Sequence, residues 1–585
     1  MGVHSQKFVI SEPLDAGQPR TGRTEPESAA SLPAVPAALL DRIFKHLNAE
    51  ERAMALQYRL VPVAWLPHTI LYADASASPL SRNSDAQWPV VARIQPHDFE
   101  RAVHRNWRRS LARGAAYGLV VKAPIFSARA GLPGILQILP FAIATVLVCA
   151  LLPLASVADI AGLIASSFFL GVIWLRLLAV SEKGEDEPDE PEMDDTRLPT
   201  YSVLVPLFRE TRVLPQILHA LQCLNYPTHK LDIKLILEET DTGMKRELAR
   251  FKLPPQFEVL VVPAGTPQTK PRALNYALHF ARGSLLTIYD AEDIPEPMQL
   301  RQAARRFANS PTSLACLQAE LAFYNSNENW LTRQFTIEYA VLFKLMLPSL
   351  AKLNWPLPLG GTSNHFRTET LRVAGGWDAH NVTEDADLGI RLARLGYTVA
   401  TLSSITYEEA SSTPRNWLKQ RARWLKGFLI TWLVHMRRPR LLQDEIGTGG
   451  FLVMQASLLG VVASAVLHPL FLLLLGWKML NGGFAMHGLQ ALLDCYFVAL
   501  IPVSWLVMML ASARALNAKG MHGWTASLFT VPIYWLCISA AGLLALWEFF
   551  RAPFHWNKTQ HGISRLMQTS SEVRKGASIS RPGSA

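Results

Sequence analysis

The sequence is poor in charged residues and in cysteine. Only 18% of its 585 residues are Asp, Glu, Lys or Arg, against roughly 25% in an average soluble protein, and 50% are hydrophobic. This balance excludes a disordered or fibrous chain and disfavours a wholly soluble enzyme. The cysteines form no Cys-x-x-Cys pair, which argues against a disulfide framework and a zinc site. They are Cys149, Cys223, Cys316, Cys495 and Cys537.

The chain also lacks a zinc-finger, homeodomain or RNA-recognition motif. Its 57 Lys and Arg nevertheless exceed its 47 Asp and Glu, for a formal net charge of +10. A basic excess without such motifs favours a membrane surface. We therefore predict a lipid bilayer as a partner and no nucleic acid.

Long apolar runs are abundant. About 20 predominantly apolar residues cross a bilayer as a helix. Five stretches have that length, at 132–154, 157–179, 451–477, 489–512 and 525–548. The first two predict a transmembrane hairpin over 130–180. Residues 1–34 are polar, and we expect them to be disordered and not a signal peptide.

Basic residues before the hairpin predict its orientation. They are Arg105, Arg108, Arg109, Arg113, Lys122 and Arg129. By the positive-inside rule this flank is cytoplasmic, and so are residues 181–450 after the hairpin. Three passes over 451–550 would leave the basic tail, 551–585, outside. Either 451–480 makes two short passes or the last segment is re-entrant around Pro532.

The region between the membrane segments has the pattern of an α/β domain, which we place at 199–415 after an acidic linker at 181–198. Apolar runs at 201–208, 232–239, 256–263 and 284–293 predict buried strands. Helical spacing over 214–221 and 270–281 predicts intervening helices. This alternation predicts a doubly wound, Rossmann-like parallel sheet, whose ligands bind beyond the carboxyl ends of the strands.

Acidic residues follow two of those strands. The second strand is followed by Glu238, Glu239 and Asp241, and the fourth by Asp290, Glu292 and Asp293. Carboxylates so placed can bind Mg²⁺ or Mn²⁺ and leave positions open for phosphate oxygens. One acidic triplet is more often a solvated loop, but two at one sheet edge favour a metal site.

Two later segments carry further candidate chemistry. Thr383, Glu384 and Asp385 begin a predicted helix, where acids cap the first turn and a carboxylate facing a cleft can act as a general base. Residues 416–440 predict a cationic, Trp-rich amphipathic helix. Its composition alone is typical of a segment lying on a membrane surface.

Taken in order, these segments resemble a known family. The acidic pair after the second strand, the DAED at 290–293, the TED at 383–385 and the QRARW at 420–424 resemble processive, membrane-embedded family 2 glycosyltransferases. Cellulose synthase, hyaluronan synthase and bacterial relatives form this group. The resemblance covers about residues 130–562. It implies a GT-A domain inserted between transmembrane helices.

The resemblance also implies an activity. The expected enzyme is an inverting hexosyltransferase of a bacterial inner membrane with a cytoplasmic catalytic domain. It polymerises a UDP-sugar, UDP-glucose before UDP-N-acetylglucosamine, into a β-linked exopolysaccharide and exports the growing glycan. Asp385 is the expected general base, and Asp290 and Glu292, with Asp293 as a substitute, are the expected ligands of Mg²⁺ or Mn²⁺.

Further residues match the family's binding positions. The expected contacts of the nucleotide sugar are Pro206, Phe208, Glu210, Glu239, Asp241, Lys270, Arg272, Asp290, Gln420, Arg423 and Trp424. The expected contacts of the acceptor are Gly360, Gly361, Thr362, Asn364, Glu384 and Trp424. Two positions depart from the family pattern, because Glu239 and Glu292 stand where most relatives have Asp.

Residues 35–115 predict a separate, small cytoplasmic α+β domain. Helical spacing over 39–47, strand patterns at 58–66 and 70–74, and a strand and a helix over 90–107 support it. The pattern weakly resembles the N-terminal domains of type II secretion ATPases, some of which bind cyclic di-GMP. A docking or structural role is the alternative. Cyclic di-GMP or an accessory export subunit is therefore an additional expected partner.

Two other functions stay open on the sequence. A non-processive transferase could glycosylate a membrane lipid, although the QxxRW motif argues for chain extension. An inactive scaffold or a transporter would be a different class, but transport has no need of DAED, TED and Lys270 together.

Overall fold

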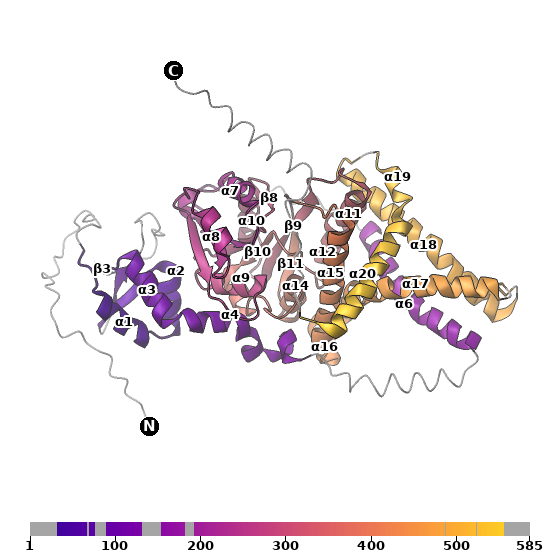
Figure 1. Cartoon of the computed structure of the whole chain (residues 1–585), viewed down its shortest axis with the longest axis horizontal. Coiled ribbons are helices and arrows are strands. Elements are labelled where there is room, and N and C mark those ends of the chain that lie inside the picture. Colours follow the sequence, from indigo (N-terminus) through magenta and orange to yellow (C-terminus); the bar gives the residue numbers. More distant parts are fainter. Residues whose placement is uncertain are drawn as a thin grey trace, which may run out of the picture.

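The computed structural model describes residues 32–66, 69–75, 89–131, 154–181, 192–481, 483–485, 487–521 and 523–554. A small N-terminal module, an α/β domain and a bundle of long helices follow one another along the molecule (Figure 1). The first predicted membrane helix, most of the acidic linker and most of the basic tail lie outside the described residues.

The N-terminal module combines helices with a three-stranded sheet. Its elements are α1 (Ala37–His46), α2 (Ala49–Tyr58), β1 (Leu60–Leu66), β2 (Thr69–Asp74), β3 (Val90–Arg93), α3 (Pro96–Asn106) and α4 (Arg108–Lys122). The sheet has the order β1-β2-β3. Stacking of Phe44 on Trp107, with ring centroids 4.3 Å apart, joins α1 to the start of α4. The strands and helices expected over 39–107 are present.

The α/β domain is built on an eight-stranded sheet of order β6-β5-β4-β7-β10-β9-β11-β8. Its strands are β4 (Tyr201–Leu207), β5 (Leu231–Glu238), β6 (Phe257–Val262), β7 (Leu285–Ile288), β8 (Ile294–Pro295), β9 (Leu314–Phe323), β10 (Asn364–Arg367) and β11 (Thr398–Glu408). The four predicted strands, now β4 to β7, pair in parallel. The sheet as a whole is mixed, because β10 runs antiparallel to both β7 and β9, and β8 to β11.

Helices cover both faces of this sheet. They are α7 (Leu214–Gln222), α8 (Thr242–Leu248), α9 (Lys270–Leu278), α10 (Gln299–Ala308), α11 (Trp330–Val341), α12 (Leu347–Lys352), α13 (Thr368–Val373), α14 (Glu384–Arg394) and α15 (Pro414–His435). Parallel strands buried on both faces have near-continuous apolar sequences, and all eight residues of β5 are buried. The α/β class with added membrane helices is confirmed.

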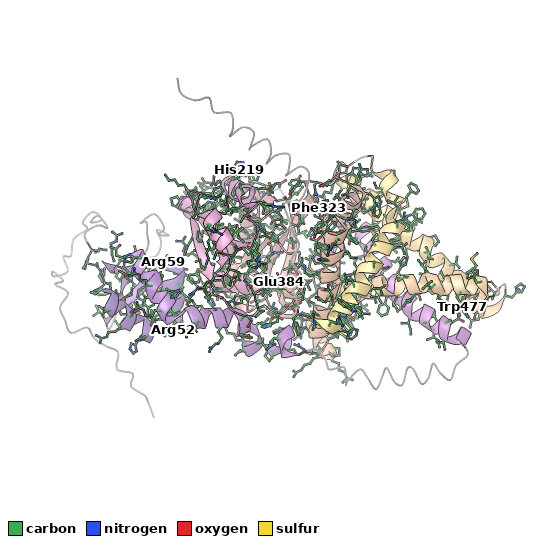
Figure 2. The ribbon with its side chains drawn as sticks, viewed as in Figure 1. Arg52, Arg59, His219, Phe323, Glu384 and Trp477 are labelled. Atoms are coloured by element: carbon green, nitrogen blue, oxygen red, sulfur yellow. The ribbon has the colours of Figure 1, made fainter. Side chains whose placement is uncertain are left out.

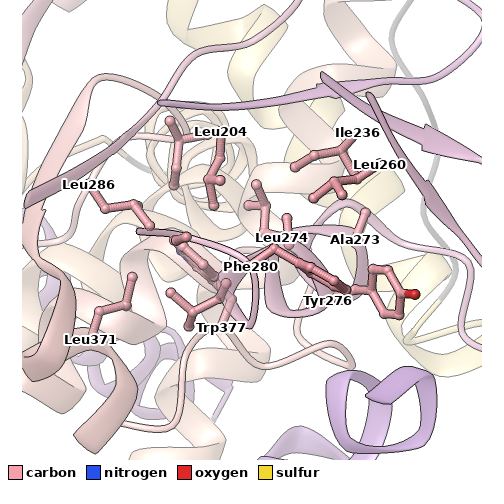
Figure 3. Packing of buried hydrophobic residues seen from close by; sticks show 14 of the residues in the cluster. Leu204, Ile236, Leu260, Ala273, Leu274, Tyr276, Phe280, Leu286, Leu371 and Trp377 are labelled. Carbon is pink, nitrogen blue, oxygen red and sulfur yellow. The ribbon is translucent and has the colours of Figure 1, made fainter. Parts of the chain in front are cut away.

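Figure 3 shows how α9 is held on one face of the sheet. Leu204 of β4, Ile236 of β5 and Leu286 of β7 lie in one buried cluster with Leu274 and Ala277 of α9. Burying such side chains stabilises the contact by roughly 1.5–3 kcal/mol each. The packing fixes the first residue of α9, Lys270, at the carboxyl edge of the sheet.

Four helices in the described residues are long and apolar enough to cross a membrane. They are Val157–Ser181 (within α6, Leu154–Ser181), Pro439–Leu480, Gly488–Ala518 (α18) and Val531–Arg551 (α20). The short α19 (Thr525–Leu528) precedes α20. The protein is therefore membrane-associated.

The stretch over 451–480 is one helix and not two short passes. α16 (Pro439–Met454), a π-helical turn (Gln455–Gly460) and α17 (Val461–Leu480) are continuous, and α17 passes through Pro469. The break in this run lies earlier, at Gly447, whose φ of 70° leaves the helical region. Glycine tolerates that angle because it has no Cβ.

Candidate active site

Lys270 and Asp290 form the centre of the candidate site. Lys270 opens α9, and Asp290 lies just beyond β7. The Lys270 Nζ lies 2.6 Å from Asp290 Oδ1 and donates to the Gly361 carbonyl at 2.7 Å. Burial alone would lower the pKa of Lys270, but Asp290 and Glu384 outweigh burial and raise it. The ammonium therefore stays charged within a ring of carboxylates.

Glu292 lies in the loop that follows β7, and Glu408 is the last residue of β11. Both line the same cavity as Lys270 and Asp290. Burial, followed by the like charge of Asp290, raises the pKa of Glu292 to about 8. Burial and the charges of Glu292 and Asp290 also raise the pKa of Glu408 well above its usual value. Carboxylates crowded in this way repel one another when ionised, and a divalent cation would relieve the repulsion.

The described residues contain no ready group of three or more His, Cys, Asp or Glu placed to hold a metal. Mg²⁺ commonly uses one or two protein carboxylates and completes its shell with water and substrate phosphates. Asp290 and Glu292 are both in the cavity lining and fit that mode. Holding a divalent cation there remains a prediction.

Two other predicted acids support the backbone instead. The Asp293 side chain is fully buried, and its Oδ2 accepts hydrogen bonds from the Asp290 N–H at 2.7 Å and from the Thr362 hydroxyl. Asp241 caps α8 through the Met244 N–H at 3.0 Å and holds the Arg209 N–H at 2.6 Å. Both carboxylates thus shape the loops that carry the expected donor contacts.

The TED motif places its acids where sequence reasoning expected them, at the first turn of α14. Glu384 is 4% exposed, and burial with the charge of Asp385 raises its pKa to about 8. Burial also raises the pKa of Asp385, although the Ala386 N–H, Lys270 and Arg423 oppose the rise. In Figure 2, Glu384 lies near the middle of the molecule.

The QxxRW motif lies on α15, which packs against α14 and the membrane helix α20. Gln420 accepts from the Ser411 hydroxyl at 3.0 Å, and Trp424 stacks near Tyr339 with centroids 6.3 Å apart. Burial lowers the pKa of Arg423, against the charges of Glu384 and Asp385. Arg423 lines the same cavity as Glu384 and Asp385.

A glycine lets α15 approach the TED motif. A Cβ at Gly427 would collide with the Thr383 side chain. Thr383 and Asn381 meet Thr431, one turn further along α15, through their side chains. The spacing between Asp385 and Arg423 therefore depends on Gly427 having no side chain.

Gly427→Ala is expected to destabilise the protein by about 1–3 kcal/mol, because the added methyl overpacks this contact. The rate of sugar transfer should fall as well. The added methyl group pushes α15 away from Thr383 at the start of α14, and this displaces Arg423 relative to Asp385. Thermal unfolding in detergent and initial transfer rates measure the two effects. Gly476→Ala is the control, because a Cβ at Gly476 meets nothing within 4 Å. Equal behaviour of the two variants would contradict the close-approach role.

One cavity of about 410 Å³ joins these groups. The predicted residues that line it are Lys270, Asp290, Glu292, Gly360, Gly361, Thr362, Glu384, Asp385, Gln420, Arg423 and Trp424. A Cβ at Gly361 would lie 3.2 Å from Asp385 Oδ2 and 4.0 Å from Lys270 Nζ, so the glycine keeps this space open. The cavity continues between the membrane helices to Ser464, His468 and Ser504.

The other six predicted nucleotide contacts lie outside the lining of that cavity. They are Pro206, Phe208, Glu210, Glu239, Asp241 and Arg272, with Asn364 on the acceptor side. Arg272 is buried, donates to the Pro263 carbonyl and lies 3.6 Å from Glu238. Asn364 donates to the Gly360 carbonyl at 2.7 Å, so it shapes the glycine loop.

Sequence reasoning missed several cavity residues. Glu408 ends β11 and precedes another acid, but Ser and Thr residues interrupt the apolar pattern that identified the two predicted acidic clusters. Glu338 on α11 pairs with Arg421 of α15, with Arg421 Nη1 2.9 Å from Glu338 Oε1, and accepts from the Tyr534 hydroxyl at 2.8 Å. No local sequence pattern predicts these contacts, because the residues that form them are far apart in the chain.

Residues 285–547 match the sequence model of the family described as "Glycosyl transferase family group 2". This part of the chain is therefore similar to family 2 glycosyltransferases. The matched region contains the DAED, TED and QxxRW motifs of the site and extends through the membrane helices to α20.

Among individual relatives, the probable glycosyltransferase YdaM of Bacillus subtilis is 28% identical over 235 residues, 39% of this chain and 55% of YdaM. Glucomannan 4-beta-mannosyltransferase 2 of Arabidopsis thaliana is 26% identical over 42% of this chain and 47% of its own length. The chain thus spans about half the length of these two relatives. Beta-monoglucosyldiacylglycerol synthase of Synechocystis is 26% identical over 63% of this chain and 76% of that enzyme.

Among solved structures, the mannosyltransferase PcManGT of Pyrobaculum calidifontis, in complex with GDP-Man and Mn²⁺, covers 67% of this chain and 99% of its own. The sequence identity is 17% and the TM-score 0.45.

Proposed function

We propose that the protein is an inverting, processive glycosyltransferase that polymerises a nucleotide sugar, with UDP-glucose as the first candidate donor. The product would be a β-linked glycan that leaves through the membrane helices. The observation that carries the proposal is the single cavity joining Asp290 and Asp385 to the space between α6, α17, α18 and α20.

The membrane part of that cavity suits a hydroxyl-rich chain. Ser457, Ser464, Ser504, Ser539 and His468 line it. The hydroxyls of Ser457 and Ser464 are buried and have no hydrogen-bond partner among the described residues. A buried hydroxyl without a partner is costly, and the hydroxyls of a sugar chain could satisfy both. An apolar lipid chain could not form hydrogen bonds with these two hydroxyls.

The residues at the cytoplasmic end suit the chemistry of transfer. Asp385 would take the proton of the acceptor hydroxyl as its oxygen bonds to the anomeric carbon of the donor. The bond from that carbon to the diphosphate breaks, and the negative charge develops on the leaving group. Lys270 and Arg423 would stabilise this charge, since Arg binds two phosphate oxygens at once. A divalent ion on Asp290 and Glu292 would neutralise the diphosphate further.

The proposal is tested with membranes containing the full chain, Mg²⁺ or Mn²⁺, and one labelled donor at a time. UDP-glucose and UDP-N-acetylglucosamine follow from the motifs, and GDP-mannose is added because a relative is named for mannosyl transfer. A large, glycosidase-sensitive polymer from one donor supports the proposal and identifies the sugar. Label confined to extracted lipid, or no incorporation from any donor, overturns the polymerase.

Transfer to a membrane lipid is the second candidate. It is favoured by the match to beta-monoglucosyldiacylglycerol synthase, which covers 76% of that enzyme. The same experiment separates the two, because a glycolipid partitions into organic solvent whereas a polymer does not.

Ser464→Phe is expected to shorten the polymer, because a phenyl ring would fill the cavity where α17 lines it. Chain length should fall severalfold while transfer to a short soluble acceptor is retained, since the catalytic carboxylates lie elsewhere in the cavity. Gel filtration of the labelled product measures the length. Leu473→Phe is the control, because Leu473 lies on the same helix and is 69% exposed. Unchanged product length in Ser464→Phe would contradict passage through this cavity.

A further inference from the structure

The N-terminal module is attached directly to the donor side of the α/β domain. Its last helix, α4, packs along α9, the helix that begins with Lys270. Asn275 of α9 donates to the Ala115 carbonyl at 3.1 Å, and the Tyr117 hydroxyl lies 3.2 Å from the Thr266 carbonyl. The module thus contacts an element of the site and the loop before it.

Two arginines of the module reach the end of the sheet formed by β6 and β5. Arg59 lies 2.7 Å from Glu258 on β6, and Glu258 lies 2.5 Å from Lys234 on β5. Figure 2 labels Arg59 on the module. Arg108, the first residue of α4, lies 2.6 Å from Glu239, directly after β5. Both ion pairs therefore fall on the β5–β6 edge.

The pair between Arg108 and Glu239 involves a residue that the sequence predicted to contact the nucleotide sugar. One oxygen of Glu239 accepts from Arg108 and the other from the Ala264 N–H at 2.8 Å. The carboxylate is therefore held from two directions. The Ala264 N–H and the Arg108 guanidinium also lower the pKa of Glu239, so it stays ionised and acts only as an acceptor.

An ionised carboxylate in this place selects bases that offer an N–H. Uracil presents one at N3, and guanine presents N–H groups at N1 and N2. The geometry points to Arg108 as a positioning residue for donor recognition, supplied by the N-terminal module: it orients the Glu239 carboxylate for the base of the nucleotide sugar. This inference rests on the proposed use of a nucleotide-sugar donor.

The arrangement gives the module a role in catalysis without placing it in the cavity. Arg108 is one of the basic residues from which the sequence predicted a cytoplasmic flank, and its side chain is only 19% exposed and contacts Glu239. Glu239 is 41% exposed, so solvent screens the pair and the expected effect is moderate. Any displacement of α4 would weaken donor binding through this contact.

Arg108→Ala is expected to weaken binding of the nucleoside diphosphate about twofold to fivefold, the order expected for a partly screened charge pair. In transfer assays the donor KM should rise by a similar factor with kcat changed less than about twofold, because binding and not transition-state stabilisation is lost. Calorimetry on the full chain in detergent, with Mn²⁺ and either UDP or GDP, measures binding without requiring transfer. Arg109→Ala is the control, because Arg109 follows on the same helix, is exposed and carries the same charge.

A double-mutant cycle separates positioning from a merely structural effect. If Arg108 acts through Glu239, the variant with both Arg108→Ala and Glu239→Gln should bind no more weakly than Glu239→Gln alone. Additive losses, or wild-type nucleotide affinity in Arg108→Ala, overturn the inference. Intact nucleotide binding without sugar transfer overturns only the proposed function. A wild-type chain that binds neither UDP nor GDP overturns both.

Discussion

Asp385→Asn should reduce sugar transfer by about 10²–10⁴-fold, the usual contribution of a positioned general base. The amide nearly preserves the shape of the side chain but cannot accept the proton of the acceptor hydroxyl. Asp385 lines the cavity at the first turn of α14, with Lys270 and Arg423 nearby. Initial rates at saturating donor and acceptor measure the loss in kcat.

The pH dependence gives this prediction a second readout. Burial raises the pKa of Asp385 above that of an ordinary carboxyl, so the base becomes protonated at a higher pH than usual as the pH falls. The wild-type rate should therefore decline as pH falls through that raised pKa. Residual activity of Asp385→Asn should lose this dependence. Asp444→Asn, an exposed charge-matched change, is the control. Full activity of Asp385→Asn would assign the base elsewhere.

Removal of divalent metal should reduce transfer at least about 10²-fold, because a cation held by Asp290 and Glu292 would stabilise the negative charge of the diphosphate by several kcal/mol. Exhaustive chelation followed by Mn²⁺ or Mg²⁺ should abolish and then restore activity. Asp290→Asn should show a comparable loss that added metal restores only in part. It removes both a proposed ligand and the carboxylate that lies 2.6 Å from Lys270.

The matched control for Asp290→Asn is Glu369→Gln, whose side chain is 78% exposed and lies on α13. Undiminished activity after complete chelation would overturn the metal assignment. A loss in Asp290→Asn with unaltered metal dependence would instead assign Asp290 to holding Lys270.

The two acidic clusters illustrate the limit of reasoning from residue type. Asp290 and Glu292 line the cavity as predicted, whereas Asp293 turns inward to the Asp290 N–H and Thr362. A sequence identifies where carboxylates gather, because strand ends follow from apolar runs. Which carboxylate faces the ligand depends on the local backbone, which the pattern of residue types does not specify.

Local patterns in the sequence were sufficient for β4 to β7, for α9 and α14, for the QxxRW helix and for the four described membrane helices. Each has a hydrophobic period, and period is a property of neighbouring residues. Tertiary structure alone decided the insertion of antiparallel β10 between β7 and β9, which carries the Gly360–Gly361 loop to the site. It also decided the pairing of Arg108 with Glu239, 131 residues apart, and the continuity of the cavity with the membrane helices. These depend on which distant surfaces pack together, and no short segment of the chain encodes that choice.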